Sequence, residues 1–106
     1  MKRWQEDLES EIRSKFSDDY TLLKWVKFKG REILCGIGRM AFTTGLFIDL
    51  DRVGYYGRYC FSEYADAVIA LRDLEEIPSD LRIEGGWIKF KGHVEFSNEN
   101  SVPLTK

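Results

Sequence analysis

Apolar residues recur at every fourth position near the start of the chain, at Trp4, Leu8, Ile12 and Phe16, with charged residues filling the gaps. This spacing places the four side chains along one narrow stripe of a helix. The pattern therefore predicts an amphipathic helix over residues 4–16, which the Ser-Asp-Asp sequence directly after it ends.

Between Leu22 and Phe61 the pattern changes to β-branched and aromatic runs. Turn residues that include a glycine separate these runs, as tight hairpins require. The runs predict a four-strand meander over residues 22–28, 31–42, 46–50 and 55–61. The turns that join the strands are expected at Lys29-Gly30, Thr43-Thr44-Gly45 and Asp51-Arg52-Val53-Gly54.

The helical period returns after Phe61. Ser62 is expected to cap a second helix over residues 63–76, and Pro78 lies just past its end. Its apolar face carries Tyr64, Ala67, Val68, Leu71 and Leu74. A last strand is expected near residues 87–96, with a further short strand at 81–83. The order predicts an α+β domain over residues 1–97, with both helices on one face of a mainly antiparallel sheet and a flexible tail over 98–106.

Strict alternation along the strands would make both faces of this sheet apolar, which is unusual for a small antiparallel sheet. A β-bulge at Gly36-Ile37-Gly38 switches the alternation and leaves one face open. The helix-covered face then carries Val26, Phe28, Ile33, Cys35, Met40, Phe42, Leu46, Ile48 and Leu50. The open face carries Trp25, Lys27, Glu32, Arg39, Phe47, Asp49, Tyr56 and Arg58.

One short segment occurs twice. Residues 25–30 (Trp-Val-Lys-Phe-Lys-Gly) return at 87–92 with five identities in six positions. In a strand, the Trp and the first Lys of each copy point to the same side. A Trp beside a Lys on an open face can stack on a ring and neutralise an anion. The alternative is that the Lys stems merely cover the Trp rings.

Aromatic residues make up 14% of the 106 residues, the unusual feature of a composition whose net charge is -2. Five Lys and Arg against one Glu over residues 24–39 make the sheet basic, whereas residues 72–84 hold five acidic residues. Such layers would orient an anionic partner toward the sheet. A surface whose charges pair internally gives the same composition.

The chain has no apolar run of the roughly 20 residues that a membrane span needs, and no apolar segment follows the basic pair near its start. Cys35 and Cys60 lack CxxC spacing and are expected to be separate thiols in the core. A cytoplasmic protein without a membrane partner is therefore expected.

Three motifs have ordinary structural explanations. Residues Gly36–Ala41 match the glycine pattern of a dinucleotide-binding loop, but no helix can follow them. Asp49–Gly54 begins like a calcium-binding loop, but the sequence favours a hairpin turn. His93 is the only histidine, so no triad or zinc site can be assembled around it. No cofactor and no metal is predicted. Acid–base chemistry by paired carboxylates stays open, because such pairs come from distant positions.

The densest aromatic stretch is Tyr55–Phe61. Tyr55, Tyr59 and Phe61 are expected in the core. Tyr56 and Arg58 point the other way, and these residue types are common both at interface hot spots and in base stacking.

Several of these segments together resemble a group of small uncharacterised bacterial and prophage proteins. The resemblance covers residues 36–98 and rests on Gly57-Arg58-Tyr59-Cys60-Phe61, on the helix with Ala67 and Ala70-Leu71, and on Gly86–Gly92 followed by Ser97-Asn98. Residues 74–85 depart from the group's Pro/Gly-rich turn. The resemblance implies a phage or mobile-element origin, and short phage proteins of this kind often inhibit or modulate a host protein. It carries no activity.

The sequence thus predicts a small non-enzymatic binding protein that engages a host protein through the open face of its sheet. The expected binding residues are Trp25, Lys27, Arg39, Tyr56, Arg58, Trp87 and Lys89. Binding of nucleic acid or a nucleotide by the same face is the alternative, and an enzyme with an unrecognised site is a third. Whether the protein is a monomer or a homodimer is left open.

Overall fold

A computed structural model describes residues 1–15, 20–77 and 90–97 of the chain. The described elements are the helices α1 (Arg3–Lys15) and α2 (Tyr64–Asp73) and six strands. The strands are β1 (Tyr20–Phe28), β2 (Arg31–Arg39), β3 (Thr44–Ile48), β4 (Gly57–Phe61), β5 (Glu76–Ile77) and β6 (His93–Ser97). The predicted strand at 81–83, most of the predicted last strand and the predicted tail lie outside the described residues.

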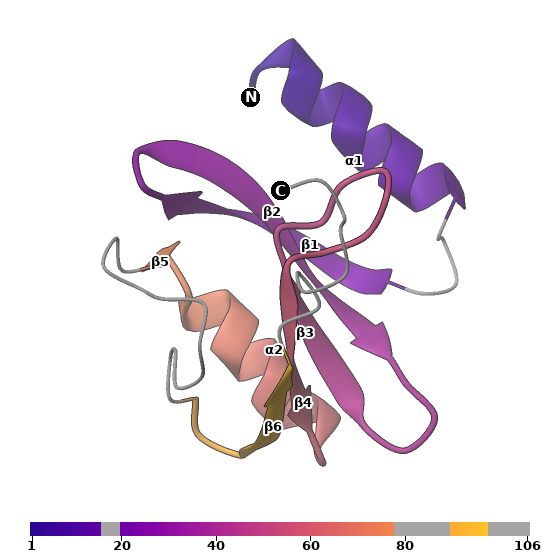
Figure 1. Cartoon of the computed structure of the whole chain (residues 1–106), viewed down its shortest axis with the longest axis vertical. Coiled ribbons are helices and arrows are strands. Elements are labelled where there is room, and N and C mark those ends of the chain that lie inside the picture. The colour runs from indigo at the N-terminus through magenta and orange to yellow at the C-terminus, as the bar shows by residue number, and fades with distance from the viewer. Residues whose placement is uncertain (16–19, 78–89, 98–106) are drawn as a thin grey trace.

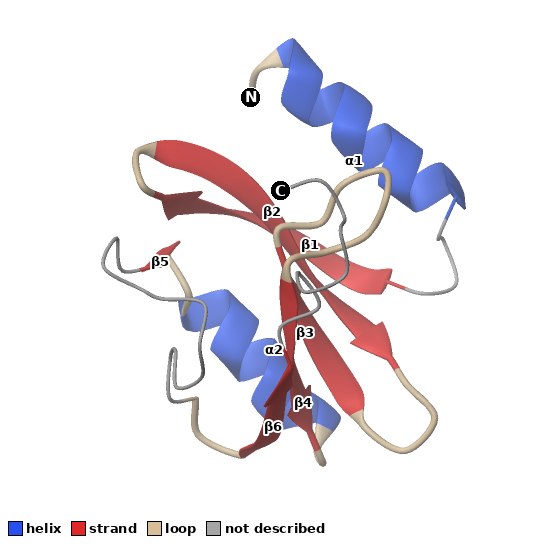
Figure 2. Cartoon of the chain, in the orientation of Figure 1, coloured by secondary structure: helices blue, strands red, loops and turns tan. Residues whose placement is uncertain are grey.

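All six strands form one sheet, in the spatial order β5-β1-β2-β3-β4-β6 (Figure 2). The four central strands are the predicted meander, and every pair is antiparallel except β1 with β5. Lys29 and Gly30 both have positive φ in the turn between β1 and β2, as a two-residue hairpin requires. The α+β class and the mainly antiparallel sheet are confirmed.

The two helices pack on opposite faces of the sheet, which corrects the expectation that both cover one face (Figure 1). Strict alternation along β1–β4 supplies an apolar layer on each side, so each layer needs its own helix. We call the layer under α2 the α2-side cluster; its buried strand residues are Val26, Ile33, Cys35, Ile37, Leu46, Ile48, Tyr59, Phe61 and Ile77. The α1-side cluster on the other face consists of Leu8 and Ile12 of α1 with Leu34, Phe47 and Leu50 of the sheet and the loop after it.

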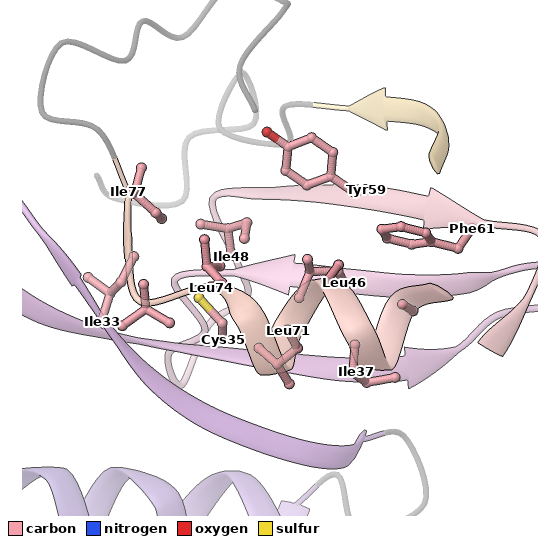
Figure 3. Packing of buried hydrophobic residues seen from close by; sticks show 13 residues of the cluster. Ile33, Cys35, Ile37, Leu46, Ile48, Tyr59, Phe61, Leu71, Leu74 and Ile77 are labelled. Atoms are coloured by element: carbon pink, nitrogen blue, oxygen red, sulfur yellow. The ribbon is translucent and has the colours of Figure 1, made fainter. Parts of the chain in front are cut away.

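Side chains from α2 and from the residue after it cover the α2-side cluster. Leu71 of α2 and Leu74, which directly follows the helix, lie over Cys35 and the neighbouring strand residues (Figure 3). The helix ends at Asp73, three residues before the predicted end, because the Lys24 ammonium donates to the carbonyl oxygens of Leu71 and Arg72 at 3.2 and 2.7 Å. The Lys27 backbone amide of β1 then donates to the Glu75 carbonyl oxygen at 3.2 Å, and the chain continues as β5. The predicted cap Ser62 is replaced by Glu63, whose side chain makes no capping bond.

The predicted bulge at Gly36–Gly38 is wrong. β2 pairs with β3 in uninterrupted register there, and the irregularity lies instead in β1, between Tyr20 and Leu22. Gly36 is needed for packing, because a Cβ on it would lie 2.8 Å from Leu23 Cδ2 and 2.9 Å from Leu50 Cδ1. Because no bulge switches the alternation, Met40 and Leu50 pack on the α1 side and not under α2. Phe42 is exposed.

Replacing Gly36 by Ala should lower the free energy of unfolding by about 1–3 kcal/mol, because the added methyl overpacks a filled site. Urea unfolding measures the loss. In a Leu50→Val background, which removes the nearer Leu50 methyl, the same replacement should cost less; an unchanged cost would contradict the packing explanation.

The strand ends differ from the predicted ones for local reasons. β2 stops at Arg39 because the Met40 amide donates to the carbonyl oxygen of Thr43 at 2.8 Å, which closes a turn over residues 40–43. β3 stops at Ile48 because Asp49 has a φ of 61°, outside the strand region. The turn predicted after Asp51 is confirmed, since its carboxylate accepts the amides of Val53 and Gly54, both at 2.9 Å.

Both cysteines are buried free thiols on separate strands, as the sequence predicts. Burial raises the pKa of Cys35 to about 12, because the thiolate would be desolvated in the α2-side cluster. A folded pKa above the unfolded value means that the contribution to stability is full below about pH 9 and is lost as pH rises toward 12. The free energy of unfolding should therefore fall over this range.

The Cys35→Ala variant isolates this effect from other titrating groups. Its stability relative to the natural protein, measured by urea unfolding, should be lowest up to about pH 9 and should recover as the pH rises from 9 toward 12. A constant difference across this range would contradict a neutral, buried Cys35 thiol.

Candidate functional site

The five described residues of the predicted site do not share an open face. Trp25 packs against the α1-side cluster, and Lys27 follows it on the same side of β1. Tyr56 packs against the α2-side cluster. Trp87 and Lys89 lie outside the described residues, so the second copy of the repeated segment is described only from its Phe90.

Trp25 lies at the edge of α1 rather than on an open surface. Its Nε1–H donates to the Glu9 carboxylate at 2.6 Å, and its ring meets the Trp4 ring edge to face with centroids 5.4 Å apart. A cleft of about 460 Å³ beside it is lined by Met1, Lys2, Gln5, Trp25 and Glu32. Trp25 thus helps to seat α1, a role that the sequence did not predict.

Arg58 lies on the α1 side, next to Phe47 of β3. Its Nη1 donates to the Tyr55 hydroxyl oxygen at 3.2 Å. Burial opposes the guanidinium charge, but hydrogen bonds to Cys60 and Tyr55 outweigh that effect and raise the pKa of Arg58 above its ordinary value. Arg58 therefore stays charged and joins β4 to the loop that precedes it.

Two basic residues of the sheet, Lys24 and Arg31, pair with carboxylates within the molecule. Lys24 contacts Glu75 at 3.4 Å in addition to the end of α2, and Arg31 lies 3.7 Å from Asp49. Such pairs favour the internally paired explanation of the charge pattern over a free basic face for these two side chains. Lys29 and Arg39 are exposed and lie over aromatic rings instead, Phe28 and Tyr64.

Arg39 belongs to the most exposed aromatic surface among the described residues. Its guanidinium carbon lies 5.6 Å from the centroid of the Tyr64 ring, at the start of α2. The Tyr64 hydroxyl is 3.1 Å from Thr21 Oγ1 of β1. Three separate elements therefore hold the Tyr64 ring and the Arg39 head in place.

Phe42 completes this surface. Its side chain is 97% exposed in the loop between β2 and β3, and Tyr64 is 39% exposed. A hollow of about 320 Å³ between the loop and the start of α2 is lined by both aromatic residues and Arg39. We call the group the Phe42 surface: Arg39, Met40, Ala41, Phe42, Ser62 and Tyr64.

The sequence pattern missed Phe42 and Tyr64 as surface residues. The alternation predicts Phe42 on the helix-covered face because it extends the strand to residue 42, and the helical pattern predicts Tyr64 on the apolar face of its helix. The usable signal is the Thr43-Thr44-Gly45 sequence, which shows that the chain turns near Phe42. Ending the strand a few residues earlier frees Phe42 from the alternation.

The other residues that the sequence singles out for chemistry take part in packing or in the backbone of the sheet. His93 Nδ1 lies 2.9 Å from the Phe90 carbonyl oxygen, and its ring packs on Tyr59. Gly36–Ala41 runs through β2 into the loop after it, and α2 follows only after two further strands. Over residues 1–15, 20–77 and 90–97, no three His, Cys, Asp or Glu side chains gather into a group suited to a metal ion.

Comparisons with known proteins add no function. In the described part of the chain, no helix has the length and apolar character to cross a membrane. The resemblance to small bacterial and prophage proteins stays a prediction. No protein-family model, no curated protein and no solved structure matches the chain.

Proposed function

We propose that this chain is a small non-enzymatic binding protein that engages a partner protein through the Phe42 surface. The observation that carries the proposal is the 97% exposed Phe42 ring beside an Arg39–Tyr64 stack. An exposed large aromatic side chain gains free energy when a partner covers it. Tyr and Arg are also the residue types that dominate interface hot spots. The loop is held by its own turn, so little ordering is needed on binding.

A protein partner fits this surface better than a nucleic acid. Base stacking by the predicted face would need Trp25 and Tyr56 together, but these residues pack on opposite sides of the sheet. Arg39 is the exposed cation of the Phe42 surface, and the neighbouring Glu63 is exposed as well. The proposed partner is a host protein, in line with the resemblance to prophage proteins. Protein binding through apolar contacts should survive a rise from roughly 50 to 200 mM salt, whereas phosphate contacts should not.

The test is capture from a lysate of the source cells with matched baits. The natural protein and the Val53→Ala variant should retain the same protein, identified by mass, and the Phe42→Ala variant should lose it. Val53 is a suitable control because it is 63% exposed in a different loop. Equal retention by all three baits would refute the Phe42 surface, and retention of nucleic acid that salt releases would favour the alternative function.

A further inference from the structure

The outer edge of β1 is largely unpaired within the described residues. β1 is the second strand of the sheet, and only the two-residue β5 lies beyond it. β5 pairs with β1 only at Lys27 and Phe28, at one end of the strand. The edge from Thr21 to Val26 has no strand beside it among the residues that the structure describes.

Printed hydrogen bonds fix which backbone groups point outward at this edge. The Leu50 amide donates to Leu34, so the backbone of Leu34 faces β3, and Trp25 opposite it makes no ladder bond to β2. The Lys27 amide donates outward to Glu75. Because direction alternates along a strand, the amide and carbonyl groups of Leu23 and Trp25 point away from the sheet, in line with those of Lys27.

This edge adjoins the Phe42 surface. The bulge residue Thr21 is exposed, and its hydroxyl contacts Tyr64 of that surface at 3.1 Å. Leu22, beside it, is a 40% exposed apolar side chain. A chain lying along β1 would therefore pass directly from outward-pointing backbone groups to Leu22 and Tyr64.

We propose that the partner binds with an extended segment that adds a strand to this edge, next to Thr21–Trp25. An extended chain repeats its amide and carbonyl groups every second residue, which matches the spacing of the outward groups on Leu23 and Trp25. β5 already pairs with β1 on this side at Lys27 and Phe28, just beyond the proposed segment. The backbone bonds supply affinity, and contacts with Leu22 and Tyr64 supply selectivity. This inference rests on the proposed protein-binding function.

The test uses linear peptides selected from a displayed random library against the natural protein. Bound peptide should protect the Leu23 and Trp25 amides from hydrogen exchange, whereas the Lys24 and Val26 amides, already bonded to β2, should change little. The Leu23→Pro variant removes one outward amide without removing a bond to β2, and it should weaken peptide binding by about ten-fold or more. If this variant unfolds, hydrogen exchange at the Leu23 and Trp25 amides of the unmutated protein tests the added strand by itself.

The Phe42→Ala variant separates the two proposals. Loss of binding in Phe42→Ala, with neither exchange protection at Leu23 nor an effect of Leu23→Pro, would overturn the added strand and leave the Phe42 surface standing. Binding that Leu23→Pro weakens but Phe42→Ala leaves unchanged would overturn the Phe42 surface and leave the added strand standing. Failure to select any peptide would overturn the added strand, as would protection that rises with protein concentration alone, since a second copy would then occupy the edge.

Discussion

Replacing Phe61 by Ala is expected to lower the free energy of unfolding by about 3–5 kcal/mol, while the same replacement at Phe42 changes it by less than about 0.5 kcal/mol. Phe61 is 0% exposed in β4, inside the α2-side cluster. Its ring lies 6.2 Å from the Phe90 ring and 6.3 Å from the His93 ring, between centroids. Truncation would leave a cavity that these rings and α2 cannot close.

Phe42 is the matched control because the chemical change is identical and only the surroundings differ. Urea unfolding followed by far-UV circular dichroism gives both free energies. The Phe61 loss would be a large share of the 5–15 kcal/mol typical of a domain of this size. Similar losses at the two positions would mean that the loop carrying Phe42 packs against the protein, which would also remove the basis of the Phe42 surface.

The second large effect concerns affinity. For the partner that the capture experiment identifies, the Phe42→Ala variant should raise Kd by about 30-fold or more, the loss of a hot-spot aromatic worth about 2 kcal/mol. Arg39→Ala should weaken binding by about ten-fold, because it removes both a charged contact and the group that stacks on Tyr64. Isothermal titration calorimetry measures these changes.

Controls for the affinity measurement come from the same chain. Val53→Ala and Ile69→Ala remove exposed apolar side chains elsewhere and should leave Kd within about two-fold of the natural value. Each variant must first show natural stability in urea, which the exposure of these residues predicts. A Kd that responds equally to all four replacements would indicate general apolar adhesion rather than a site.

The sheet could be predicted from the sequence because its signals are local. Alternation defined the strands, and the Lys29-Gly30 pair defined the first hairpin, whose two positive φ angles these residues supply. The strict alternation itself also indicated that both faces are apolar. No bulge at Gly36 is needed, because a helix packs on each of the two apolar faces.

The helix positions and the candidate site could not be predicted in the same way. The stripe of Leu8 and Ile12 shows that α1 packs on something, but no local pattern specifies which face of the sheet receives it. The exposure of Phe42 depends on where β2 ends, and that end is set by one backbone bond between Met40 and Thr43. The alternation predicts Trp25 on the side of its strand opposite Val26, which the structure confirms. That side is covered by α1, however, and is not open.

The most direct test of the Phe42 surface places a photo-crosslinking amino acid at one position at a time within the source cells. Residue 42 is compared with residues 53 and 69, which are exposed on other parts of the molecule. We expect light to join the protein to one partner from position 42 and not from positions 53 or 69. Crosslinks from position 53 or 69 with none from position 42 would contradict the proposed site.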